Sequence, residues 1–520
     1  MQTMNQDQLT SLLSSMQPTR NSKLDSLFAL MQALPKAETA DEKERLFAEA
    51  HDKFLPELST MLYRLKNSNY DKSLEEIKKV LESKYMIPTR EYDQPSNFFQ
   101  DTKHDTITQG THASDSLDPY DFFLDAFDME SRVSNLVYML GYHPKFLSIF
   151  LEAHKRIMYG NSVLSQSWRH YIAIMAAASQ GCLYLVTLEE LNFLNCKGPV
   201  LWLEGLENIP TKLKKLQEVN RILVSAPWKL EKKHITQLVD DPVAENRWSF
   251  QQIVHAFLIL SRYHSLSQLA LGCGIKIESD HPLSKESVIT SKSIWISKAF
   301  PDMNVAENLV ANLKKIDSEI NCHETDVEKE FINLATRDPI KPPPELLVPH
   351  PYLRRYLCEK CLLREEFTPE EGINDELICR ASEYNWLEHG YTLLQNMCQD
   401  STEKIVDDEF QIGDDLTYGK VGPVACDNTQ EIRVGLKRYT QCLLGHFYED
   451  YKYKNITELL KDFRLPIKLI TYYPFLFTRA DFERLNPFEY TEKIHINIIM
   501  MEGRQKAELL YALRPYREYS

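Results

Sequence analysis

Cys182 is the residue whose surroundings first suggest chemistry. It follows an alanine-rich stretch within RHYIAIMAAASQGCLYLV (169–186), and Tyr184 comes two residues later. A cysteine that reduces a peroxide needs a lowered pKa and a nearby proton carrier, because the thiolate attacks and the departing oxygen must be protonated. A small buried apolar residue is the alternative interpretation, and for a single cysteine it is the more common one.

Arg433 and Glu492 carry charges that a free amino acid could use. A pocket for an amino acid recruits an acid for the ammonium group and an arginine or hydroxyls for the carboxylate, because buried charges need partners. From their positions in the sequence alone, both side chains would be ordinary charges on helix surfaces.

Cys358 and Cys361 form an isolated CxxC pair beside Lys- and Arg-rich sequence. A structural zinc site needs four ligands, and no second pair stands at a suitable spacing. The ten cysteines of the chain show no disulfide spacing either, so reduced thiols are the simplest account. We therefore predict no metal site and no cofactor.

Helices are expected to position these residues. Glycine is scarce (16 of 520 residues), and apolar residues recur at helical spacing. One apolar stripe covers 133–140 and is closed by Gly141, and Pro144 opens the next helix. The pattern is typical of an all-α protein.

Two longer helices have recognisable ends. Ser249 and Gln252 have the spacing of a capping box ahead of a long helix. Thr429 can serve as the N-cap of a core helix that we expect to reach Phe447. A final helix is predicted over 494–513, before Pro515.

At 520 residues the chain is too long for a single core. We expect an N-terminal extension (1–114) that is partly helical or disordered, a helical domain (115–275), a linker (276–380) that contains Pro342 to Pro344, and a second helical domain (381–520).

Charge and hydropathy exclude two classes of partner. The net charge is −15 and no Lys/Arg cluster is present, so nucleic acid is not expected to bind. No signal peptide and no apolar run of membrane-spanning length are visible. We expect a cytoplasmic protein, with the nucleus as a further location.

The amino-acid sequences of several segments resemble those of the sestrin family. The similar segments fall within 118–275 and 381–520, and they include RHYIAIMAAASQGCLYLV, GYHPKFLSIFLEAH, PWKLEKKHI, HSLSQLALGCGI, WLEHGY, FYEDYKY and EKIHINIIMMEGRQKAELLYALR. The resemblance implies two related helical domains of the alkylhydroperoxidase type, joined by a partly disordered linker.

The resemblance also implies a hydroperoxide-reducing site. Cys182 would be its catalytic residue and Tyr184 its assistant, but the family's histidine falls at Glu189. A buried carboxylate could still relay protons, since desolvation raises its pKa. A charge on the helix surface is the more common role for such a glutamate.

A second implied site is a leucine pocket. The matching positions are Thr417, Tyr418, Thr429, Arg433, Glu492 and His495. Two positions depart from the family: Lys420 replaces a lid threonine, and Leu485 replaces the tryptophan of the pocket floor. Losing the indole removes contact energy on the order of 1–3 kcal/mol, or roughly ten- to hundredfold in affinity. We therefore expect weak leucine binding or a different amino acid.

A third implied site binds a protein partner, GATOR subcomplex two. Ser249, Glu449 and Asp450 occupy the family's contact positions, although Ser249 can also be a helix cap and the two acids a solvated loop. Rag GTPases and AMP-activated kinase are further partners that the resemblance implies. The sequence thus supports a regulator that inhibits TOR kinase signalling, with a thiol-dependent alkyl hydroperoxide reductase as the competing hypothesis.

Overall fold

Helices dominate the computed structural model of the chain. The described residues are Thr39, Arg45, 95–99, 119–130, 132–278, 281–285, 305–318, 326–357, 364–369, 377–416, 419–426, 428–485 and 488–518. The predicted all-helical class is confirmed in the coarser sense of a mostly helical fold, and the strands among these residues are each two residues long.

The first half of the described chain supplies eight α-helices. They are α6 (Pro119–Glu130), α7 (Asn135–Leu140), α8 (Pro144–His154), α9 (Gln166–Ser179), α10 (Leu183–Asn195), α11 (Thr211–Ser225), α12 (Lys232–Val239) and α13 (Phe250–Gly272). Gly141 caps α7 and Pro144 begins α8, as the sequence predicted.

The second half supplies further α-helices, short 3-10 and π-helical segments, and the described strands. The α-helices, together with the last 3-10 helix, are α14 (Val305–Ser318), α15 (Val327–Thr336), α16 (Thr392–Met397), α17 (Thr402–Asp415), α18 (Gln430–Leu443), α19 (Tyr453–Leu459), α20 (Arg464–Tyr472), α21 (Arg479–Glu483), α22 (Tyr490–Leu513) and η14 (Arg514–Glu518). Strand β1 (Cys379–Arg380) pairs in parallel with β4 (His446–Phe447), and β2 (Lys420–Val421) pairs antiparallel with β3 (Val424–Ala425).

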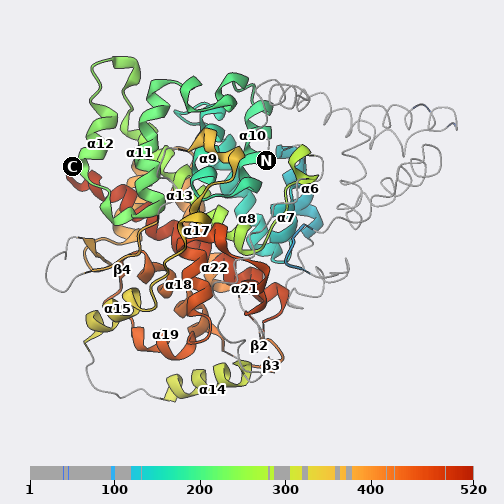
Figure 1. The fold of residues 1–520 in the computed structure, drawn as a ribbon, viewed down its shortest axis with the longest axis vertical. Coiled ribbons are helices and arrows are strands. Elements are labelled where there is room, and N and C mark those ends of the chain that lie inside the picture. Colours follow the sequence, from blue (N-terminus) through green and yellow to red (C-terminus); the bar gives the residue numbers. More distant parts are fainter. Residues whose placement is uncertain are drawn as a thin grey trace.

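The two longest helices, α13 and α22, lie side by side in the middle of the molecule (Figure 1). Almost every residue of each is buried, which is typical of a helix enclosed on all sides. The apolar residues of both halves belong to one continuous core. The division into two related domains therefore stays a prediction.

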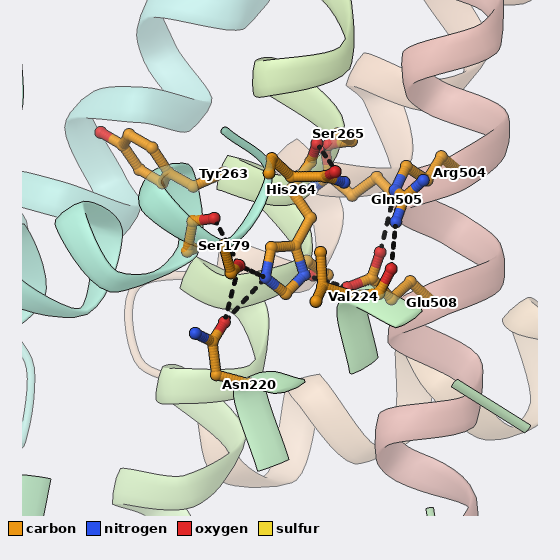
Figure 2. Close-up of polar contacts among 12 residues, drawn as sticks. Ser179, Asn220, Val224, Tyr263, His264, Ser265, Arg504, Gln505 and Glu508 are labelled. Carbon is orange, nitrogen blue, oxygen red and sulfur yellow. Dashed lines mark hydrogen bonds and ion pairs between the residues drawn. The ribbon is translucent and has the colours of Figure 1, made fainter. Parts of the chain in front are cut away.

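A buried polar network joins these two helices to α11 (Figure 2). His264 of α13 lies between Asn220, whose Oδ1 is 2.8 Å from Nε2, and Glu508, which contacts Nδ1. Arg504 lies one turn from Glu508 on α22; its Nε donates to that carboxylate at 3.1 Å, and a second nitrogen donates to the Val224 carbonyl at 3.2 Å. Each charge in this part of the core therefore has a partner, as burial requires.

The prediction that the helix after Thr429 reaches Phe447 is wrong. α18 ends at Leu443, and Gly445 adopts a left-handed conformation (φ 79°) that an α-helix cannot contain. The chain then enters β4, where Phe447 pairs with Arg380 of β1. The apolar spacing continues past the helix because both the helix and the strand face the core.

Parts of the expected linker pack tightly. Phe331 of α15 is fully buried, with its ring centroid 5.0 Å from that of Phe447. The hydroxyls of Tyr352 and Tyr356 donate to the Glu190 carboxylate at 2.7 and 2.6 Å. Phe331, Tyr352 and Tyr356 thus belong to the core, whereas Cys358 and Cys361 lie outside the described residues.

The described piece of the expected extension is also packed. Ser96 forms a bridge with Ile275 at the end of α13, and the ring of Phe99 stacks on Tyr490 at 4.5 Å. Across the described ranges, no helix combines the length and the apolar character needed to cross a membrane.

Candidate functional site

Cys182 lies at the turn that joins α9 to α10. Gly181 supplies the turn with a positive φ of 74°, and a side chain there would meet Phe475. The Cys182 side chain is fully buried, and this burial raises the pKa of the thiol to about 12, against the opposing effect of the Leu185 amide and the Ser267 hydroxyl. At neutral pH it is therefore a protonated thiol, which is a poor nucleophile.

Tyr184 does not offer its proton to Cys182. Its hydroxyl accepts a hydrogen bond from the Leu136 amide at 2.9 Å and donates to Glu278 Oε1 at 3.2 Å. Burial raises the pKa of the Tyr184 hydroxyl well above its ordinary value, so the phenol keeps its proton. The side chain thus fixes the start of α7 against the segment that follows α13.

The expectation of a surface position for Glu189 is wrong. The side chain is buried between α9 and α10, with Oε2 2.7 Å from His170 Nδ1 and Oε1 accepting from Asn192 Nδ2 at 3.3 Å. Burial lowers the pKa of His170, but the adjacent Glu189 carboxylate outweighs it and the pKa rises to about 9. Sequence reasoning missed His170, although the same quoted stretch contains it.

Arg433, expected at the ligand carboxylate, and Thr429, expected in the lid over the ligand, are in direct contact. Arg433 Nη1 donates to Thr429 Oγ1 at 2.6 Å, and Nε donates to the Asp414 carbonyl at 3.2 Å. Thr429 holds the N-cap position of α18 as predicted, but its hydroxyl accepts from Arg433 and does not cap the helix. The pair presents a cation and a hydroxyl at one place.

Glu492, expected at the ligand ammonium, lies in the first turn of α22 and is buried. Its carboxylate accepts the Gly422 amide at 2.9 Å, from the turn between β2 and β3, and the Glu489 amide at 2.7 Å. Burial raises the pKa of Glu492. Lys420 forms an ion pair with Glu489 at 2.7 Å, so its ammonium is directed to the rim of this hairpin.

His495 follows Glu492 by one turn and is held neutral. Its Nε2 is 3.2 Å from the Gly413 carbonyl, and burial lowers the pKa of the ring well below its ordinary value. Arg433 lies close enough to lower that pKa further. Leu485 is buried just after α21, while Thr417 and Tyr418 lie outside the described residues. The structure thus places Arg433 near His495, and gives no direct contact between Arg433 and Glu492.

A cleft of about 590 Å³ opens beside Arg433, and sequence reasoning did not find it. Its residues come from the segment before α16, from α17, α18 and α22, and from the residue that follows β4, and most are polar or charged. Besides Arg433 they are Asn385, Trp386, Leu387, Asp414, Asp415, Gln430, Val434, Lys437, Arg438, Tyr448 and Lys506. The only signal in the sequence is the repeat of cations at 433, 437 and 438 on one helix face.

Ser249 is the N-cap of α13, as its sequence context predicted. Its hydroxyl accepts from the Gln252 amide at 3.2 Å, and its own amide donates to Gln252 Oε1 at 3.1 Å. The residue is nevertheless exposed. Capping and contact with a partner are therefore compatible.

Glu449 and Asp450 follow β4 at the surface. The Glu449 carboxylate accepts from the Ser382 hydroxyl at 2.5 Å and from its amide at 3.3 Å, so its position is fixed. Asp450 is exposed. One acid is thus anchored and the next is available to solvent.

The C-terminal 3-10 helix η14 connects these two surface positions. The ring of Tyr516 packs edge-on against Phe250, the residue after Ser249, at 5.6 Å. The guanidinium of Arg517 lies over the ring of Tyr384, two residues after Ser382, at 5.6 Å. Adjacent side chains of η14 therefore contact both regions.

Metal ligation has no candidate in the part of the chain that the structure describes. Nowhere in these residues do three or more His, Cys, Asp or Glu side chains gather in a way that could hold an ion.

Comparison with known proteins gives one consistent result. A family model described as "PA26 p53-induced protein (sestrin)" matches residues 95–520. Sestrin-2 of Mus musculus is 32% identical over 416 residues, which are 76% of this chain and 86% of that protein. Sestrin-1 of Xenopus laevis is 30% identical over 438 residues (78% and 89%), and sestrin-3 of Mus musculus is 29% identical over 429 residues (76% and 86%).

Proposed function

The chain belongs to the sestrin family, and on this basis we propose that it is an amino-acid-responsive regulator that inhibits TOR kinase signalling by binding GATOR subcomplex two. The observation that supports the proposal is the surface position of Ser249, Glu449 and Asp450, which together we call the partner surface. An exposed hydroxyl and a fixed carboxylate followed by an exposed one lie at positions that η14 links.

The form of the partner surface suits a regulated protein contact. Ser249 belongs to the first half of the chain and the acidic pair to the second. The affinity of a partner that contacts both would therefore depend on how the two halves are placed relative to each other. η14 directly continues α22, whose first turn contains Glu492. A ligand that engages the first turn of α22 would therefore act on the helix that continues into η14, whose Tyr516 contacts Phe250 beside Ser249.

The proposed ligand is a free amino acid. Arg433 and Thr429 would receive its carboxylate, and Glu492 its ammonium, since a carboxylate has acceptor capacity beyond the two amides that it already binds. Leu485 would form the pocket floor and would offer less contact area than an indole, so we expect leucine to bind weakly or a different amino acid to be preferred.

Partner capture tests the proposal. Full-length chain is immobilised and incubated with purified GATOR subcomplex two, and the double variant Glu449→Ala/Asp450→Ala is compared with the original. We expect capture to fall at least about tenfold, because both carboxylates are removed from the contact. The matched control is Glu483→Ala, an exposed ion-paired acid on α21, across α22 from β4 in Figure 1. Undiminished capture by the double variant would overturn the proposal.

The geometry gives less support to a hydroperoxide reductase that acts through Cys182. The sulfur is sealed from solvent, its pKa is raised to about 12, and the nearby phenol is bonded elsewhere. A peroxide would have no access to the sulfur, and the thiol would not be ionised to the reactive thiolate.

A further inference from the structure

The cleft of about 590 Å³ beside Arg433 contains more positive than negative charge. Arg433, Lys437 and Arg438 line it from α18, and Lys506 lines it from α22, which packs against α18 (Figure 1). The acids among the described lining residues are the last two residues of α17, both aspartates. Four cations against two acids leave an excess of two positive charges in this cleft, although the whole chain has a net charge of −15.

Two of the four cations are engaged with the aspartates of α17. Lys437 Nζ forms an ion pair with Asp414 Oδ2 at 2.5 Å. Arg433 donates to the Asp414 carbonyl at 3.2 Å, and the carboxylates of Asp414 and Asp415 both lie within electrostatic reach of its guanidinium. The excess positive charge therefore falls on the other two cations.

Lys506 is the first of these two. Its ammonium lies over the rings of Trp386 and Phe410, with Nζ 5.8 and 5.4 Å from the ring centroids. No carboxylate of the described residues forms an ion pair with it. Burial, together with the charge of nearby Lys437, lowers the pKa of Lys506 to about 7, and two aspartates of α17 oppose this shift only from a distance. An anion in the cleft would favour the protonated form of Lys506.

Arg438 is the second cation without an acidic partner. Its guanidinium carbon is 3.3 Å from the centroid of the Tyr448 ring, and Nη1 donates to Gln441 Oε1 at 3.0 Å. In the part of the chain that the structure describes, no carboxylate is paired with it. Arg438 is close enough to Lys506 for its charge to lower the pKa of that ammonium further. The two side chains therefore lie within reach of one bound anion.

The charge and the size of the cleft define the chemical class of its ligand. A phosphate monoester carries a charge of about −1.5 to −2 at pH 7, which matches the excess of two positive charges better than a single carboxylate does. Guanidinium and ammonium groups are the side chains that bind phosphate oxygens most strongly. The volume of about 590 Å³ is in the ordinary range for small-molecule sites and leaves room for an organic group. The amide side chains of Asn385 and Gln430 in the lining suit hydroxyl groups on that part of the ligand.

We propose that the cleft between α17, α18 and α22 binds a small organic phosphate, a phosphate monoester on a hydroxylated group, with Arg438 and Lys506 as the side chains that contact the phosphate. The site is separate from the proposed amino-acid site, with which it shares Arg433. Glu492 and His495 are not among the residues that line the cleft.

Acetylation of Lys506 in the full-length chain tests whether a phosphate occupies the cleft. The protein is treated with an N-hydroxysuccinimide ester near neutral pH in the presence of glucose 6-phosphate, glycerol 3-phosphate, leucine, or chloride at the same ionic strength, and peptide mass spectrometry quantifies each lysine. We expect at least one of the two monoesters to slow acetylation of Lys506 about threefold or more, because bound phosphate covers the ammonium and keeps it protonated. Lys404, exposed on α17 and outside the cleft, should react at an unchanged rate.

A pair of variants identifies the contacts. In calorimetric titration with the protecting monoester, Arg438→Gln/Lys506→Met should bind at least about tenfold more weakly, because two charge-assisted contacts to the phosphate are lost. Lys404→Gln, the matched control, removes an exposed cation and should bind as the original chain does. Circular dichroism checks that each variant keeps its fold.

Three results would overturn the assignment. They are acetylation of Lys506 at the chloride rate in the presence of both monoesters, equal protection of Lys506 by leucine, and undiminished binding by the double variant. Loss of partner capture produces none of these results, so this proposal and the proposed function fail separately.

Discussion

The Nδ1 atom of His170 lies 2.7 Å from the Glu189 carboxylate, and both side chains are sealed between α9 and α10. This ion pair has consequences for the stability of the fold.

The pair should make unfolding depend on pH in a defined direction. The pKa of His170 is raised to about 9 in the folded chain, from an ordinary value of 6.5. Its stabilisation is therefore complete below pH 6.5 and is lost as the pH rises through about 9, for a total on the order of 3 kcal/mol. Urea unfolding should show lower stability at pH 9 than at pH 6, and Glu189→Gln should shrink that difference. The control, Glu218→Gln, removes an exposed pair with Arg221 and should leave the pH dependence intact. An unchanged pH dependence in Glu189→Gln would contradict the assignment.

Glu508→Ala should destabilise the junction of the two halves strongly. The change leaves the Arg504 guanidinium and His264 without their shared carboxylate in the core, which costs about 3–5 kcal/mol. Thermal or urea unfolding measures the loss. Glu483→Ala, which breaks an exposed pair on α21, should cost under about 1 kcal/mol. Equal small losses in the two variants would show that the buried network contributes little.

Leu485→Trp should strengthen leucine binding. The larger ring would add contact area at the proposed pocket floor, and the gain expected is about ten- to hundredfold in affinity. Isothermal titration with free leucine compares the two proteins, and thermal unfolding checks that the buried site accepts the indole. Low-micromolar leucine affinity in the original chain would refute the expectation of weak binding.

Two substitutions at Ser249 separate its two roles. Ser249→Ala removes the cap of α13 and should lower stability by about 0.5–2 kcal/mol. Ser249→Asp keeps a side chain that can accept from the Gln252 amide, so stability should hold, while the added negative charge should weaken partner capture. If Ser249→Asp binds the partner as well as the original chain, Ser249 is a cap alone.

Short sequence motifs predicted where helices begin and end better than they predicted which side chains contact each other across the fold. Gly141, Pro144 and the Ser249 capping box act at the positions that the sequence indicated, because caps depend on residues only a few positions apart. The last helix begins at Tyr490, four residues before the predicted start, because Glu489 and Glu492 form a capping box that the apolar pattern does not reveal.

Tertiary contacts explain what the sequence could not reveal. Glu189 is polar and helical, so only the packing of α9 on α10 reveals that it is buried against His170. We expected a linker over 276–380, yet Tyr352 and Tyr356 within it bind Glu190 across more than 150 residues of sequence. The 590 Å³ cleft depends on residues from five separate segments, and no single segment indicates it.

The most direct test of the proposed function is the capture of purified GATOR subcomplex two by the full-length chain, measured without amino acids and with a saturating mixture of them. The account predicts capture in their absence and a reduction of at least about fivefold in their presence, with the Glu449→Ala/Asp450→Ala variant near background in both. No capture under either condition, or equal capture under both by the original chain and the variant, would contradict it.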